Sequence, residues 1–253
     1  MTAFDEHLDA WQAWQQAPWG RIRYRVAAET LARTVTSLGG GSLRVLDVGG
    51  GDGSDAAPLA AAGHAVTVLD QSADLLAQAA ARGLDTVHGD VETLGSLGLG
   101  LFDLVLCHNV VQYLPSTSEL VDALARAVHE RGAISLMAPS PPAELLAAAI
   151  RRADLAEADA LLDATTIRTQ TFDHEVRRVS AEEAIDALSS AGFTDATRYG
   201  IRCVTDYIAD DDRKSDPGFY AELEALELRL CDREPFLRTA RIWQVVARRH
   251  ARA

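Results

Sequence analysis

The residues with the clearest chemical meaning form a glycine-rich loop at positions 49–53. The apolar run Val45–Val48 predicts a buried strand, and Gly49-Gly50-Gly51-Asp52-Gly53 separates it from a helix predicted to begin at Ser54. Glycine lets the backbone approach a ligand that a β-carbon would push away. In a parallel sheet, ligands bind beyond the carboxyl ends of the strands. The loop therefore predicts a binding site for a nucleotide-like ligand.

Two carboxylates at this loop indicate the charge of the ligand. Asp47 precedes the loop and Asp52 lies within it, so a diphosphate would be repelled there. Ser54 stands where a dinucleotide-binding fingerprint has its third glycine. A sulfonium cation is attracted by the same carboxylates. The pattern favours S-adenosyl-L-methionine, with S-adenosyl-L-homocysteine as its product, over NAD, and no constellation for hydride transfer supports an oxidoreductase.

Further carboxylates follow the next two predicted strands. Asp70 lies about 20 residues beyond the loop, where a carboxylate accepts both hydroxyls of a ribose. Its alternative role is to cap the next helix, which Ser72 can do alone. Asp90 suits the adenine amino group, with the backbone of Val91 against the ring, and its alternative is a plain turn residue. The cofactor-binding residues predicted from this region are Asp47, Gly49, Gly50, Gly51, Asp70, Gln71, Asp90 and Val91.

His108 ends the fourth predicted strand, and a histidine there is expected near the reacting methyl group. A hydrogen-bonded core histidine is the equal alternative. If the methyl acceptor is a hydroxyl, His108 is the candidate base, whereas an ionised carboxylate needs no base. Tyr113, downstream of this strand, is a candidate substrate contact.

The elements that must position these residues alternate between strand and helix patterns. Such alternation predicts an α/β Rossmann-like, doubly wound, mostly parallel seven-stranded sheet with helices on both faces. The predicted strands are Leu43–Val48, Ala65–Leu69, Asp85–His88, Phe102–Cys107, Ala133–Met137, Phe193–Ile208 and Ile242–Ala247. The predicted core helices are Ser54–Ala62, Ser72–Arg82 and Ser118–Glu130, the last with a capping box of Ser116 and Glu119.

A single domain over 1–253 is expected to hold these elements. Residues 1–41 form a helical cover, 42–138 the cofactor-binding core, 139–179 an insertion that covers the substrate, and 180–253 the C-terminal strands and helices. The insertion is predicted to hold one helix, Ala143–Leu162. A second capping box pairs Ser180 with Glu183, and Asp216 caps a helix whose inner face carries Leu223, Leu226 and Leu230.

Composition limits the cell compartment and the partners. The formal net charge of −13 disfavours a protein that covers long nucleic acid, although a local basic patch stays possible. No apolar run reaches the length of about 18 residues that crosses a membrane, and the N-terminus lacks the features of a secretory signal. Three widely separated cysteines fit a reducing cytoplasm. The oligomeric state stays open.

From Asp47 to Met137 the pattern resembles class I S-adenosylmethionine-dependent methyltransferases. Both ends of the chain are similar to one branch, the bacterial tRNA 5-carboxymethoxyuridine methyltransferases, which methylate the carboxylate of a modified wobble uridine. The stretches that carry this resemblance are Phe4–Glu6, Gly20–Arg23, Val45–Gly53, Gly200–Tyr207, Tyr220–Glu227 and Arg233–Phe236.

The resemblance implies roles for two arginines. Arg23 would hold the carboxylate of the cofactor, and Arg202 would face the substrate and pair with an anionic group. Gly49, Gly50, Asp70, Asp90, Val91 and His108 would line the cofactor. Members of the family carry a lysine-rich run in this part of the chain. Here the corresponding stretch is Ala164–Arg178, which contains acidic residues as well as arginines. The acceptor is therefore either tRNA or an anionic small molecule, and a cofactor-binding module without activity is a further alternative.

Overall fold

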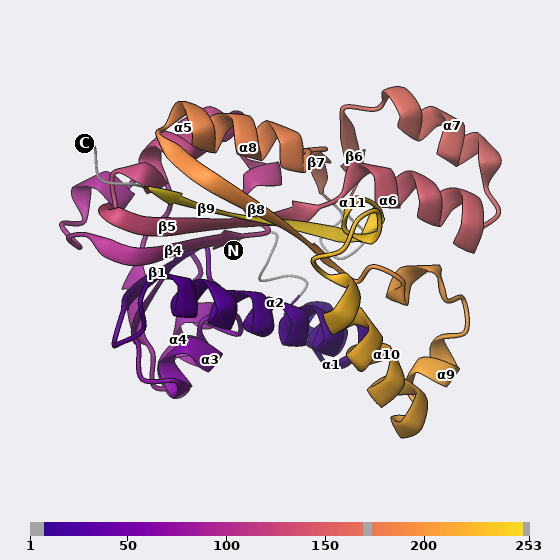
Figure 1. The fold of residues 1–253 in the computed structure, drawn as a ribbon, viewed down its shortest axis with the longest axis horizontal. Coiled ribbons are helices and arrows are strands. Elements are labelled where there is room, and N and C mark those ends of the chain that lie inside the picture. The colour runs from indigo at the N-terminus through magenta and orange to yellow at the C-terminus, as the bar shows by residue number, and fades with distance from the viewer. Residues whose placement is uncertain (1–7, 169–173, 250–253) are drawn as a thin grey trace. The chain divides into compact units, whose positions relative to one another are not determined.

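The computed structural model describes residues 8–168 and 174–249 of the chain (Figure 1). None of the helices in these ranges combines the length and the apolar character that a membrane crossing requires. The chain divides into two compact units, each built from three segments. One unit holds the segment up to Glu29 together with Pro139–Ser180 and Arg198–Gln244, and the other holds Thr30–Ala138, Ala181–Thr197 and the segment from Val245.

A seven-stranded sheet has the order β3-β2-β1-β4-β5-β9-β8. Strand β1 pairs in parallel with β2 and β4, β2 with β3, and β4 with β5. This arrangement confirms the predicted Rossmann-like, mostly parallel sheet. The strands are β1 (Arg44–Val48), β2 (Ala65–Asp70), β3 (Asp85–His88), β4 (Phe102–His108), β5 (Val128–Pro139), β8 (Phe193–Ile201) and β9 (Ile242–Arg249).

Helices cover both faces of the sheet in the unit that contains Thr30–Ala138. Helices α3 (Ala57–Ala61) and α4 (Ala73–Ala81) lie on one face, and α5 (Thr117–Ala125) and α8 (Ala181–Ser190) lie on the other (Figure 1). The two covered faces explain the continuous apolar run of β4, in which Leu104–Cys107 are fully buried. Ser116 accepts a hydrogen bond from the backbone of Glu119, as its capping role predicts.

Two predictions for this unit are corrected. The helix predicted to reach Glu130 ends at Ala125, and β5 begins at Val128 rather than at Ala133. The backbone N–H of Phe102 donates to Ala127 O at 2.8 Å. This hydrogen bond joins the segment after Ala125 to the start of β4, so the segment continues as a strand and not as a helix. The Glu183 carboxylate accepts a hydrogen bond from the Thr117 hydroxyl of α5, which joins the two helices on that face.

The insertion, in the other unit, does not contain the single predicted helix. It forms α6 (Pro141–Leu146), a π-helical turn (Ala147–Arg151) and α7 (Leu155–Asp163), and then the antiparallel pair β6 (Thr166–Arg168) and β7 (Glu175–Arg177). Ala153 has a φ of 52° at the break, and Asp154 restarts the helix by accepting from Glu157 N. The Ala- and Leu-rich composition hides this break, because only the capping residue Asp154 marks it.

The remaining helices of this unit are α1 (Leu8–Gln16), α2 (Pro18–Ser37) up to Glu29, α9 (Asp211–Lys214), α10 (Pro217–Leu230) and α11 (Phe236–Thr239). Asp216 caps α10 as predicted. The predicted inner face of α10 is wrong at Leu226, which is 42% exposed, because fully buried Glu227 takes the inward place.

Arg178 holds the insertion together. Its buried guanidinium donates to Glu144 Oε2 at 3.1 Å and to the carbonyl oxygens of Pro141, Leu161 and Ala164 at 3.0, 2.6 and 2.7 Å. These contacts join the start of α6 to the end of α7, two helices that lie against each other (Figure 1). The positive charge of Arg178 is therefore paired with Glu144 inside the protein.

Replacing Arg178 by alanine should lower the free energy of unfolding by about 3–5 kcal/mol, because Glu144 would keep a buried charge without its partner. Chemical denaturation measures the change. Arg126→Ala, at an exposed position of the other unit, is the matched control and should change stability by less than about 0.5 kcal/mol. Equal stability of the two variants would contradict the structural role of Arg178.

Candidate cofactor and acceptor site

The glycine loop has no room for side chains. Gly49 has a φ of 68°, and a β-carbon there would lie 2.5 Å from Val110 Cγ2. A β-carbon at Gly50 would lie 2.5 Å from Asp47 Cγ, so the buried Asp47 carboxylate sits directly behind bare backbone. A ligand at this loop meets peptide groups with a negative charge behind them. This surface fits a cationic ligand better than a diphosphate.

Asp70, at the end of β2, is held by two backbone amides. Gly51 N donates to its Oδ2 and Ser72 N to its Oδ1, both at 2.8 Å. Burial raises the pKa of this carboxyl group, and the two amides oppose the rise. Each oxygen keeps a lone pair, which suits the two hydroxyls of a ribose. Ser72 caps α4 itself, so capping is not the reason for Asp70, and the neighbouring Gln71 is exposed.

Asp90 follows β3 and uses one carboxylate oxygen within the protein. Its Oδ1 accepts from the backbone and the hydroxyl of Thr93, both at 2.9 Å, and the backbone bond lowers the pKa of the carboxyl group. The carboxylate is exposed, so it can also accept a hydrogen bond from an amino group of a ligand. Val91 is half-buried beside it. The arrangement fits the predicted adenine contact.

Asp52 contributes less charge to the loop than the sequence argument assumed. Its carboxylate pairs with Arg82 Nη2 at 2.6 Å and accepts from the Ser54 hydroxyl at 2.9 Å. Arg82, just after α4, was not expected in this role. The pair fixes the end of the loop, and Asp47 stays as the carboxylate behind Gly50.

His108 is buried and bonded at both ring nitrogens. Nδ1 lies 2.9 Å from Asp55 Oδ2, and Nε2 lies 2.9 Å from Ser135 Oγ. Because a carboxylate only accepts, Nδ1 donates to Asp55, while Nε2 is hydrogen-bonded to the Ser135 hydroxyl. The ring ties the segment after the glycine loop to β4 and β5. An acceptor hydroxyl would have to displace Ser135 to reach Nε2.

The turn after β4 contains a residue that the sequence reasoning missed. Gln112 lies in the 3-10 turn η3 (Val111–Tyr113) and is 4% exposed. Its Nε2 donates to Asn109 O at 2.9 Å, while its Oε1 is buried with no hydrogen-bond partner in the described structure. A lone amide in the apolar run Val110–Leu114 is the signal that marks it. Its oxygen suits a donor group of a ligand. Burial raises the pKa of the neighbouring Tyr113 phenol to about 12.

The two arginines implied by the family resemblance belong to the other compact unit. Arg23 is 3% exposed, with its guanidinium carbon 4.4 Å from the centre of the Tyr24 ring. Arg202 is 7% exposed and already pairs with Asp206, whose Oδ2 accepts from Nε at 2.8 Å and whose Oδ1 accepts from Nη2. The predicted substrate arginine thus carries its own counter-ion.

Glu227 fixes the backbone next to Arg202. Its fully buried carboxylate accepts from the backbone amides of Cys203, Val204 and Thr205 at 2.6, 3.0 and 2.8 Å. Arg202 itself has a φ of 63°, which non-glycine residues rarely adopt. This loop belongs to the stretch Gly200–Tyr207, one of those that carry the family resemblance. Another of them, Phe4–Glu6, lies outside the described residues.

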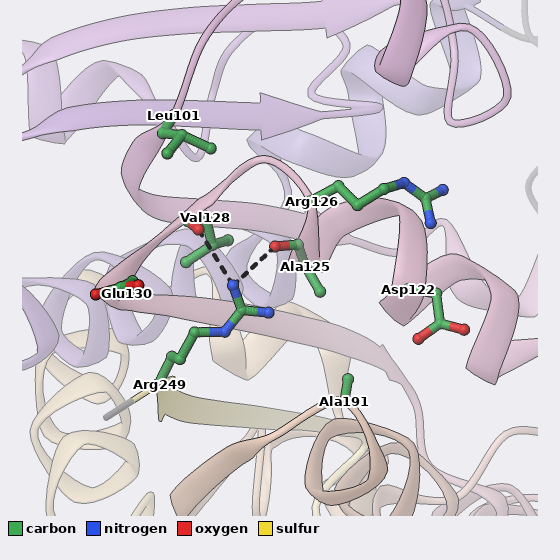
Figure 2. Close-up of a pocket in the computed structure, with 8 residues that line it drawn as sticks. All are labelled: Leu101, Asp122, Ala125, Arg126, Val128, Glu130, Ala191 and Arg249. Atoms are coloured by element: carbon green, nitrogen blue, oxygen red, sulfur yellow. Dashed lines mark hydrogen bonds between the residues drawn. The ribbon is translucent and has the colours of Figure 1, made fainter. Parts of the chain in front are cut away.

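A surface pocket of about 500 Å³ lies elsewhere (Figure 2). Leu101, Val128 and Glu130 line it at the starts of β4 and β5, the end of the parallel strands opposite to the glycine loop. Arg249 donates there to Ala125 O and Val128 O at 3.0 and 3.3 Å, as Figure 2 shows. This arginine closes the end of α5, and the pocket holds none of the predicted site residues.

Comparisons with known proteins bear on the domain and on the fold. Residues 46–136 match the model of a methyltransferase domain family. A methyltransferase of Thermotoga maritima, described as a possible histamine N-methyltransferase, has a similar structure with a TM-score of 0.63, 15% identity and coverage of 98% of both chains. Magnesium protoporphyrin IX methyltransferase of Synechocystis, solved with S-adenosyl-L-homocysteine, gives a TM-score of 0.61 at 19% identity, covering 96% of this chain and 94% of that one.

The methyltransferase domain over residues 46–136, built on a sheet of Rossmann-like order, supports S-adenosyl-L-methionine-dependent methyltransferase activity. The cofactor prediction is thereby confirmed. Within this class the chain is similar to tRNA 5-carboxymethoxyuridine methyltransferase of Escherichia coli K12, at 26% identity over 239 residues. The alignment covers 91% of this chain and 89% of the relative, so the similarity extends well beyond the cofactor-binding core.

Asp70→Asn should weaken binding of S-adenosyl-L-homocysteine by roughly 10- to 100-fold, because an amide places an NH₂ group against a backbone N–H and removes an acceptor from the ribose. Isothermal titration calorimetry gives the dissociation constants. Asp74→Asn, an exposed position in the first turn of α4, serves as the control and should bind like the native protein. Unchanged affinity in Asp70→Asn would remove Asp70 from the cofactor site.

Proposed function

We propose that the protein transfers the methyl group to a carboxylate oxygen, and that the carboxylate belongs to a modified wobble uridine of tRNA. The E. coli relative is named for a nucleoside with a carboxymethoxy group, and the similarity to it covers 91% of this chain. The resemblance includes stretches outside the cofactor-binding core. In those stretches the choice of residues is expected to depend on the methyl acceptor. A tRNA acceptor places the enzyme in the cytoplasm.

The bonding of His108 is the structural observation that supports a carboxylate. A hydroxyl acceptor needs a base, and both nitrogens of this ring are engaged by Asp55 and Ser135. The Tyr113 phenol, with a pKa raised to about 12, stays protonated at neutral pH. A carboxylate, with an ordinary pKa of about 4, is already ionised and needs neither group.

The chemistry then requires positioning more than proton transfer. S-adenosyl-L-methionine supplies a methyl group bound to a sulfonium sulfur. An acceptor oxygen would attack the methyl carbon in line with the carbon–sulfur bond, and the sulfur would leave as a thioether. Asp70 and Asp90 would hold the adenosyl part. Alignment of two bound reactants lowers such a barrier by about 7–11 kcal/mol. The fixed loop and strand ends serve this alignment.

An anionic small molecule is the second candidate acceptor. The net charge of −13 and the internal use of Arg178 favour it, because fewer cations remain for an RNA backbone. The salt dependence of KM separates the two, since RNA contacts release counter-ions and a small carboxylate releases few.

With radiolabelled cofactor, we expect label to enter unfractionated bacterial tRNA whose esters have been hydrolysed by mild alkali, which restores free carboxylates. The rate at saturating substrate should be flat from about pH 6 to pH 9, because no imidazole has to lose a proton. It should fall only where the acceptor carboxylate, of ordinary pKa about 4, becomes protonated.

Two controls complete this experiment. The label should be released again by alkali, as an ester is and a methyl ether is not. The same assay on a small-molecule extract tests the second candidate. A rate that falls as the pH drops through about 6.5 would indicate a histidine base and contradict the carboxylate acceptor.

A further inference from the structure

Arg241 is a cation that makes no salt bridge within the described residues, although its charge acts on the buried Glu144 carboxyl group. It directly precedes β9, and it lies between the residues that follow β5 and β8. Its backbone N donates to Arg202 O at 3.0 Å, and its O accepts from Ser140 N at 3.0 Å. The side chain is half-buried and makes no hydrogen bond or ion pair with any residue that the structure describes. A guanidinium in that state has all its donors available to a ligand.

The charged neighbours of Arg241 make their salt bridges with other residues. Arg202 pairs with Asp206, and Glu144 pairs with Arg178. The Tyr207 hydroxyl donates to Thr239 O. Burial raises the pKa of Glu144, and the charge of Arg241 opposes the rise. Burial also lowers the pKa of Arg202, and the like charge of Arg241 adds to this effect, so the guanidinium lies close to both groups.

Ser140 provides a second, independent observation. It is 1% exposed, and its hydroxyl oxygen has no hydrogen-bond partner in the described structure. A buried hydroxyl without a partner costs stability, and Ser140 is joined through its backbone to Arg241, a cation with no salt bridge among the described residues, so the two together point to a ligand. One guanidinium and one hydroxyl are suited to the two oxygens of a carboxylate.

We propose that Arg241, with the Ser140 hydroxyl, binds the acceptor's carboxylate and sets the specificity of this methyltransferase for an anionic acceptor. This inference rests on the proposed carboxylate acceptor. Arg202, which the family resemblance assigned to that role, instead keeps Asp206 as its partner and fixes Arg241 through the backbone bond. Arg202 is a positioning residue in this arrangement.

Charge changes during transfer give this contact a second effect. The acceptor oxygen forms a bond to the methyl carbon as the carbon–sulfur bond breaks, and the bonding pair stays on sulfur. The carboxylate becomes a neutral ester, the sulfonium a neutral thioether, and no proton moves. Arg241 therefore binds the substrate as an ion pair but meets an uncharged product, so the methyl ester binds more weakly and leaves.

The test uses alkali-treated bacterial tRNA as acceptor and compares KM and kcat among variants. Arg241→Gln should raise KM on the order of 10- to 100-fold with kcat changed less than about threefold, because a charge-assisted contact to the bound carboxylate is lost. Arg241→Lys should recover most of the affinity, and Ser140→Ala should raise KM by a smaller factor. Methyl-esterified tRNA should inhibit the native enzyme weakly.

Arg238→Ala is the matched control, since Arg238 lies three positions away in an exposed pair with Glu234 and should keep the native KM. Binding of S-adenosyl-L-homocysteine by each variant shows that it is folded. An unchanged KM in an Arg241→Gln variant that binds this ligand normally overturns the inference, and so does an Arg241→Lys variant whose KM is as high as that of Arg241→Gln. Failure of the native enzyme to label tRNA, with normal cofactor binding, overturns the proposed function instead.

Discussion

The cofactor site depends on the hydrogen bond between Gly51 N and the Asp70 carboxylate. The glycine loop closes β1 and the carboxylate closes β2, so this one contact holds two neighbouring strand ends in a fixed relation. Ser72 N holds the other oxygen from the start of α4. The carboxylate is therefore positioned before any ligand arrives, and the loop that it holds is the one that admits only backbone. A ribose meets a site whose geometry is already set.

The geometry around the glycine loop was predictable because it obeys local rules, whereas the roles of its residues toward a ligand stay predictions. A strand that ends in a glycine-rich loop, with carboxylates after the next two strands, is readable from residue types and spacing alone. The buried parallel strands β1, β2 and β4 were found for the same reason, since they are short apolar runs, whereas the strand predicted over Phe193–Ile208 ends at Ile201 and is largely exposed. Arg82 escaped prediction because a single arginine after a helix gives no sign that it pairs with Asp52, 30 positions earlier.

The errors occur where tertiary contacts decide. Apolar spacing through Ala125–Glu130 continues a helix pattern, but the backbone of Phe102 pairs this segment into the sheet. On α10 the acidic Glu227 is buried in place of the apolar Leu226. Three backbone amides of another segment donate hydrogen bonds to its carboxylate and so compensate for its burial. Arg202 and Arg178 were counted as available cations, and both are neutralised by acids that only the folded chain brings close. The roles of Arg23, His108 and Tyr113 toward ligands stay predictions.

The raised pKa of Asp70 couples cofactor retention to acidity. Burial disfavours the charged form, so this carboxyl group takes up a proton at a higher pH than an exposed aspartate does. Because the folded pKa lies above the unfolded one, ionised Asp70 costs folding free energy at neutral pH, and that cost disappears on acidification. The same proton occupies a lone pair that the ribose needs. With the proposed ribose contact, protons and cofactor would compete for this one carboxylate, in the pH range in which protonation also removes its cost to folding.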